Sequence, residues 1–297
     1  MYRNNKPVHL SPYDHPDIYP GPRPSSSFVF HHGQAHRLEL EKGKPLEKST
    51  IHLSANNEIA GTLVTAGFEQ AELAAFLDRY NFPHLDDRVP VVAYGSNVCL
   101  AQLQYKFSLD PSLNDPFIAV RSTITDSDIV YGSFLAPYGA MPAVIAPVKG
   151  AEIEVWVTLV DRNQLELVNR TEASYELRKH KGGKVVLENG QIFDTLYAYY
   201  YPKALKWDGT MTRYKDIPGN SPLPSVWEAD MINRLKDEMK FNGTREEFIH
   251  SLRWDIDFKF RVNELLQQSE ENFVHPDWET SGELLTMYSI GSTFKKE

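Results

Sequence analysis

Two short segments of the chain contain residue types and spacings that could do chemistry. In the first, VVAYGSN over residues 91–97, an apolar run ends at Tyr94, and Gly95, Ser96 and Asn97 lead into a predicted helix. Gly95 lets a ligand approach the backbone closely, and the first amides of a helix are unpaired donors that suit a carboxylate. The same residues also fit an ordinary strand–turn–helix junction in which Asn97 is the helix cap.

The second segment holds an acid that could move protons. Glu172 follows a predicted helix over residues 162–170 and precedes a predicted strand. A carboxylate in such a place can accept a proton from a substrate and return it to a leaving group. The alternative interpretation is a solvated carboxylate at a helix end.

In their order along residues 89–202, these segments and the strands between them resemble the γ-glutamylcyclotransferase-like family. The family's Tyr-Gly-Ser-Asn signature is matched without gaps by residues 94–97. Its next two strand blocks are similar to residues 142–145 and 155–157, with Gly150 between them. The order of these blocks predicts the family's fold.

The family's catalytic glutamate lies at the end of a helix, and Glu172 stands at that position. Leu165, Val168 and Asn169 fall at the family's leucine, leucine and aspartate positions. The chain departs from the family pattern where Asn169 replaces aspartate, Ala173 replaces glycine and Val144 replaces threonine. These departures bear on the choice of substrate more than on the fold.

The resemblance implies a cofactor-independent cyclotransferase that acts on a γ-glutamyl amide or a related small amino-acyl amide. The substrate's α-amine would attack its γ-carbonyl, form 5-oxoproline and release an amine, with Glu172 as the acid/base. Tyr94, Gly95, Ser96 and Asn97 would bind the α-carboxylate. Tyr199 could line the same pocket, because alternate residues of a strand share a face. This chemistry needs no metal, cofactor or covalent intermediate.

Two other functions remain open. One is a binding or scaffold protein that keeps the fold without turnover, and the other is a related acyl or amine transferase with a larger substrate. In an enzyme, Glu172 must face a pocket that residues 95–97 close on the other side. A position on the outer surface, or a structural salt bridge at Glu172, would favour the binding protein.

Other reactive residues have weaker patterns. Cys99 lies at a helix start, where a thiol can ionise more readily, but no motif pairs it with a histidine, so we expect a packed thiol. Ser96 lacks the G-x-S-x-G turn of an acyl-enzyme nucleophile. His31, His32 and His36 are close in sequence, but their stretch does not read as a helix and no further ligand is indicated. No metal site is predicted.

The elements that must position these residues indicate an α+β protein. The predicted core, over residues 67–206, is a γ-glutamylcyclotransferase-like mixed β-barrel or sheet with flanking helices, preceded by a helix over residues 68–80. Residues 89–95 should form a central strand. Residues 1–66 are rich in proline and predict an irregular extension packed on the core, with short strand candidates at residues 28–30 and 37–40.

Residues 207–297 predict a linker followed by helices. The apolar residues there are spaced by four, as expected for helix faces packed on a core. The two stripes are Trp227, Met231, Leu235 and Met239, and Phe248, Leu252, Ile256 and Phe260.

Composition narrows the classes of partner. The 297 residues are 41% hydrophobic and 24% charged, an ordinary globular mix, and the net charge of −9 argues against nucleic acid or an anionic membrane as partner. The single cysteine excludes an internal disulfide. No apolar run reaches the roughly 18–20 residues that span a bilayer, and residues 1–16 lack the apolar stretch of a secretory signal. We therefore expect a cytoplasmic protein with a small-molecule substrate, and the sequence indicates no oligomeric state.

Overall fold

Two long neighbouring strands organise the fold. In the computed structural model, which describes residues 10–53, 69–113, 115–172, 174–180 and 182–280, β6 (Phe117–Tyr131) pairs antiparallel with β7 (Ala143–Val160). Both strands are rich in β-branched residues and are buried over most of their length. A register shift between Thr125 and Ser127 interrupts the ladder.

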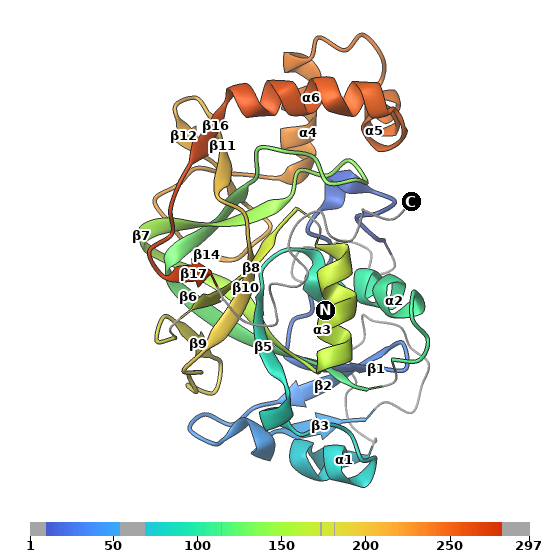
Figure 1. Cartoon of the computed structure of the whole chain (residues 1–297), viewed down its shortest axis with the longest axis vertical. Coiled ribbons are helices and arrows are strands. Elements are labelled where there is room, and N and C mark those ends of the chain that lie inside the picture. The colour runs from blue at the N-terminus through green and yellow to red at the C-terminus, as the bar shows by residue number, and fades with distance from the viewer. Residues whose placement is uncertain (1–9, 54–68, 114, 173, 181, 281–297) are drawn as a thin grey trace.

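The sheet continues outward from this central pair on both sides (Figure 1). Its strand order is β17–β8–β10–β5–β7–β6–β1–β2–β3–β4, in which β5 and β10 run parallel and the other neighbours antiparallel. The described strands thus form an open sheet, and no closed barrel is found among them. The remaining bounds are Phe28–His31 (β1), Gln34–Glu39 (β2), Thr50–His52 (β3), Gln70–Glu72 (β4), Val89–Ala93 (β5), Glu176–His180 (β8), Leu196–Tyr200 (β10) and Trp278–Thr280 (β17).

Short strands complete the sheet at its sides. β9 and β13 pair with β6, β14 pairs with β7, and β15 pairs with β13, while β12, β11 and β16 form a separate three-stranded sheet. Their bounds are Val185–Leu187 (β9), Lys203–Trp207 (β11), Thr210–Met211 (β12), Arg213–Tyr214 (β13), Gly219–Asn220 (β14), Ser225–Val226 (β15) and Glu270–Asn272 (β16).

Six α-helices in the described ranges lie around the sheet, so the α+β class predicted from the sequence is confirmed. α2 and α3 pack together beside β5, whereas α4, α5 and α6 gather at the opposite end from α1 (Figure 1). None of these helices combines the length and the apolar character that crossing a bilayer requires. The helix bounds are Leu73–Arg79 (α1), Leu100–Ser108 (α2), Arg162–Thr171 (α3), Glu228–Glu238 (α4), Arg245–Trp254 (α5) and Ile256–Gln268 (α6).

The N-terminal part of the chain differs from its prediction. Residues 28–52, which the sequence assigned to an irregular extension, contain three strands, and β1 adds directly to β6. The strand candidates at residues 28–30 and 37–40 correspond to β1 and to the end of β2. The helix predicted over residues 68–80 is α1, although Phe68 lies outside the described residues and β4 occupies residues 70–72.

The C-terminal helices are confirmed, but one of the two apolar stripes is not a single face. Phe248 and Leu252 on α5 are buried, whereas Ile256 and Phe260 on α6 are 65% and 64% exposed. Asp255 ends α5 and its side chain caps α6, so the chain changes direction between the two pairs. A four-residue spacing places side chains on one face only within a continuous helix, so it predicts no shared face across this break.

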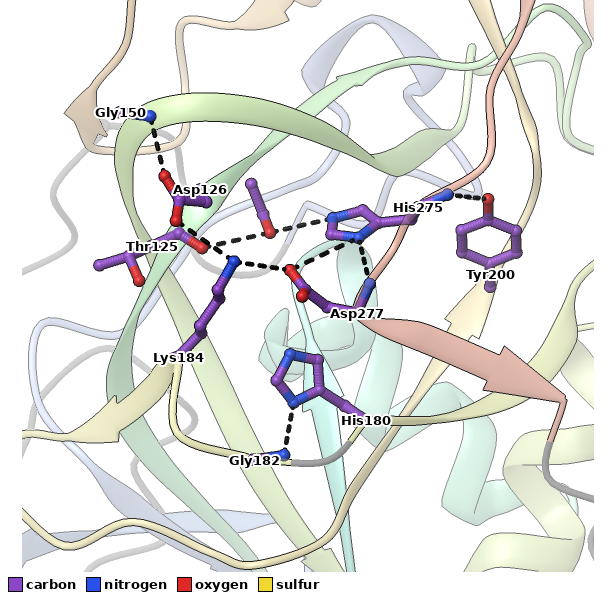
Figure 2. A network of polar contacts seen from close by, with 10 residues as sticks. Thr125, Asp126, Gly150, His180, Gly182, Lys184, Tyr200, His275 and Asp277 are labelled. Atoms are coloured by element: carbon purple, nitrogen blue, oxygen red, sulfur yellow. Dashed lines mark hydrogen bonds and ion pairs between the residues drawn. The ribbon is translucent and has the colours of Figure 1, made fainter.

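A partly buried polar network fixes the segment that leads into β17 (Figure 2). Ser127 Oγ lies 3.1 Å from His275 Nε2, and the backbone N–H of His275 donates to Tyr200 Oη at 3.2 Å. Lys184 Nζ bridges Asp126 Oδ2 at 3.2 Å and Asp277 Oδ2 at 3.0 Å. These contacts tie the end of the described chain to β6 and β10.

Candidate functional site

The loop after β5 forms one wall of the site. β5 lies between β7 and β10, which confirms the prediction of a central strand. The chain then makes a short 3₁₀ turn, Ser96–Val98, and α2 begins at Leu100 with Cys99 at the cap position. Asn97 is therefore not the helix cap. Its side chain is released for another contact.

That contact is with Glu172, which lies directly after α3. The side chain of Asp161 and that of Gln164 cap the start of α3 reciprocally, and Leu165 and Val168 are buried beneath the helix. The backbone N–H of Glu172 donates to the carbonyl of Asn169 at 3.2 Å. The acid is thereby held at a defined turn rather than on a frayed helix end.

Lys106 joins this pair from the second half of α2. Its Nζ lies 3.0 Å from Glu172 Oε1 and 2.6 Å from Asn97 Oδ1, and Asn97 Nδ2 donates to Glu172 Oε1 at 3.1 Å. The side chains of Lys106 and Glu172 are only 4% and 16% exposed. Because burial of an unpaired charge is costly, the carboxylate is what allows the ammonium to stay there.

The loop after β5 and the residues at the end of α3 line a cavity of about 280 Å³. Glu172 lines it together with Gly95, Ser96 and Asn97, and Tyr94 and Tyr199 line it as well. The structure therefore brings all the site residues predicted from the sequence to one cavity. Lys106 also contributes to the lining, although the sequence prediction did not include it.

The hydroxyl groups of Tyr94 and Tyr199 are engaged in the protein. Tyr94 Oη donates to the carbonyl of Tyr199, and Tyr199 Oη donates to Asn169 Oδ1 at 2.7 Å. Burial raises the pKa of both phenols well above the ordinary value. These two residues hold β5, β10 and α3 together and shape the cavity wall.

Further tyrosines from distant parts of the chain complete the lining, and no sequence pattern predicted them. Tyr13 contacts both Tyr105 and Tyr138, with ring centroids 4.6 Å apart in each pair. Burial, with smaller contributions from Glu172 and Tyr105, raises the pKa of Tyr13 to about 12. The tyrosines of this group are Tyr13, Tyr19, Tyr105, Tyr138 and Tyr175.

The proline-rich N-terminal segment holds the loop after β5 in place. Arg23, which is buried, donates from Nη2 to the carbonyl of Tyr94 and, at 3.1 Å, to that of Gly95. Tyr19 Oη accepts a hydrogen bond from the backbone N–H of Ala143 at 3.2 Å and stands directly over Gly95. A segment that contains the short 3₁₀ helix Pro16–Ile18 thus positions part of the site.

One signal in the sequence could have identified Lys106. Leu100, Leu103 and Lys106 recur at helical spacing, and all three are buried in α2. A lysine on the apolar face of a short helix requires a counter-charge, which directs attention to a nearby acid. Tyr13 and Tyr19 had no such signal, because their chain segment lacks any periodicity.

Of the weaker candidates, Ser96 lines the cavity, whereas Cys99 and the three histidines do not. Cys99 is fully buried. The rings of His31 and His32 contact each other at a centroid distance of 3.9 Å, and His36 lies on the paired strand β2. Within the described ranges, no three histidine, cysteine, aspartate or glutamate side chains gather as a metal ion would need.

The chain was compared with protein-family models, with curated proteins and with solved structures, and none of the three comparisons finds a match. The geometry of the cavity is therefore the ground on which a function is assigned.

Proposed function

We infer that this protein is a cofactor-independent cyclotransferase of the γ-glutamylcyclotransferase-like type, which converts a γ-glutamyl amide or a related small amino-acyl amide into a cyclic product. The observation that supports this function is the shared cavity of Glu172 and residues 95–97. Its volume of about 280 Å³ suits a small amino-acid derivative.

Glu172 is the proposed acid/base. The α-ammonium of the substrate first gives a proton to the carboxylate, and the freed nitrogen attacks the γ-carbonyl carbon. A new C–N bond closes the ring of 5-oxoproline, and the bond from that carbon to the leaving nitrogen breaks. Two protons leave the attacking nitrogen in total and two reach the departing amine, which leaves as an ammonium ion.

Positioning supplies the rest of the acceleration. The attack is intramolecular, so a cavity that holds the chain of the substrate bent brings amine and carbonyl together without a second encounter. The backbone amides at residues 95–97 are suited to bind the α-carboxylate, because the first amides of a helical turn have no partner within the turn. No metal or cofactor is required by this chemistry.

A binding protein without turnover is the second candidate, and the Lys106–Glu172 ion pair is the observation that favours it. The carboxylate of Glu172 is already engaged by the ammonium of Lys106 and the side-chain amide of Asn97, as expected of a residue with a structural role. The same cavity would then recognise a small zwitterion and release it unchanged.

The test is release of 5-oxoproline from a panel of γ-glutamyl amides and dipeptides. Glu172→Gln keeps the size of the side chain but cannot accept a proton, so turnover should fall by roughly 10²–10⁴-fold with little change in KM. Glu166→Gln is the matched control, because Glu166 lies on the same helix, pairs with Arg170 and does not line the cavity.

Equal turnover by wild type and Glu172→Gln would refute the role of Glu172. If wild type turns over no member of the panel and calorimetry nevertheless detects binding of one, the binding protein is the correct alternative.

A further inference from the structure

Lys106 has no part in the proton transfers proposed above, yet it is the most deeply buried charge in the cavity wall. An ammonium has three donors, and two of them reach Glu172 Oε1 and Asn97 Oδ1. On the acid, Oε1 accepts both hydrogen bonds, and Oε2 accepts none from the residues that the structure describes. One donor and one acceptor of the ion pair therefore remain for a ligand.

The charges of this pair match those of one chemical group. The head of an α-amino acid carries an ammonium and a carboxylate on a single carbon, so its two charges stand about as close together as Lys106 Nζ and Glu172 Oε1, which are 3.0 Å apart. When the amino-acid head lies beside this pair, its ammonium contacts the carboxylate of Glu172 and its carboxylate contacts the ammonium of Lys106. All four charges are then paired inside the cavity.

We propose that Lys106, in addition to the backbone amides at residues 95–97, binds the α-carboxylate of the substrate while Glu172 receives its α-ammonium, so that the cavity is specific for an unmodified α-amino-acid head group. This inference rests on the proposed function and names the part of the substrate that the site recognises. The tyrosine-lined remainder of the cavity is left for the side-chain amide.

Binding in this manner also prepares the acid for its task. In the free protein Lys106 and Asn97 both hold Oε1 of Glu172. The carboxylate of the substrate interacts with Lys106 and so weakens the interaction of Lys106 with Glu172. This happens as the substrate ammonium reaches Glu172. A substrate whose α-carboxylate is replaced by a neutral amide leaves Lys106 bound to Glu172, and it should therefore be processed poorly.

The experiment crosses two enzymes with two substrates. The substrates are a γ-glutamyl anilide and the same compound as its α-carboxamide, and the enzymes are wild type and Lys106→Gln. For wild type we expect kcat/KM to be roughly 30- to 300-fold lower on the carboxamide, mainly through KM. For Lys106→Gln we expect the two substrates to differ by less than about 3-fold, because the charge that distinguishes them is gone.

Lys203→Gln is the matched control. Lys203 forms an ion pair of similar length with Glu270, 2.9 Å, but it does not line the cavity, so the preference for the carboxylate should be kept. Lys106→Arg retains the positive charge and should restore part of the preference. The inference is overturned if Lys106→Gln discriminates between the substrates as strongly as wild type does.

A measurement on wild type alone covers the case in which Lys106→Gln fails to fold. Calorimetry should find that 5-oxoproline binds at least roughly 10-fold more tightly than its carboxamide, and equal affinities would overturn the inference. Turnover of the anilide without a preference for the carboxylate refutes only the role of Lys106. Absence of both turnover and binding in wild type refutes the proposed function, and the inference with it.

Discussion

The hydroxyl of Tyr19 lies where a side chain on Gly95 would begin. A Cβ built on Gly95 would stand 2.5 Å from Tyr19 Oη, closer than real Cβ atoms approach other atoms, and 3.6 Å from Cζ of the same ring. This contact by itself opposes any larger residue at position 95.

Gly95→Ala should destabilise the protein by about 1–3 kcal/mol, because the added methyl group must displace the Tyr19 ring from a packed interior. Tyr19→Phe removes the obstructing oxygen and the hydrogen bond from Ala143, at a cost of about 1 kcal/mol. In the double variant the two changes should cost clearly less than their sum, as measured by urea unfolding. Strict additivity would show that the hydroxyl is not the obstacle.

The buried histidine His275 in the network of Figure 2 predicts a loss of stability in acid. Burial lowers the pKa of His275 to about 4 from its ordinary 6.5, against a weaker opposing effect of Asp277. Between these two pH values the unfolded chain binds a proton that the folded chain does not. The free energy of unfolding should therefore fall as the pH falls from 6.5 to 4, by up to about 3 kcal/mol from this group.

His275→Gln removes this titration, and its unfolding free energy should depend less on pH over the same window. Some dependence should remain, because burial also lowers the pKa of His180 nearby. Urea unfolding of both proteins at a series of pH values is the measurement. Parallel curves for wild type and variant would exclude His275 as the source.

The tyrosines of the cavity predict a second loss of stability, in alkali. Burial raises the pKa of Tyr13 from its ordinary 10 to about 12, so above pH 10 the unfolded chain releases a proton that the folded chain keeps. The unfolding free energy should fall as the pH rises through this range, and phenolate absorbance should rise in step with unfolding.

Tyr13→Phe should move the alkaline transition to higher pH, since the unfolded chain then has one phenol fewer to ionise. Tyr80→Phe is the control, because Tyr80 is 51% exposed and does not line the cavity. If the alkaline transition moved by the same number of pH units in both variants, the buried phenol of Tyr13 would not be its source.

The sequence by itself determined the local elements of the site. The apolar run of residues 89–93, the turn at Gly95 and the helix that precedes Glu172 could be predicted, because each depends on neighbours within a few residues. The family resemblance that these elements carry also implied that Glu172 and residues 95–97 face one cavity, and both line it. The alternation of side chains along β10 likewise predicted that Tyr199 could line the cavity.

Only the tertiary structure decided which charges and hydroxyls meet there. Lys106 and Glu172 are 66 residues apart, and Tyr19 reaches Gly95 from a segment without any repeat pattern. Whether the sheet closes, and whether Ile256 and Phe260 are covered, likewise depended on strand pairing and on the helix break at Asp255. Such contacts depend on how whole elements pack, and a pattern of neighbouring residues carries no information about the partner that burial will place opposite them.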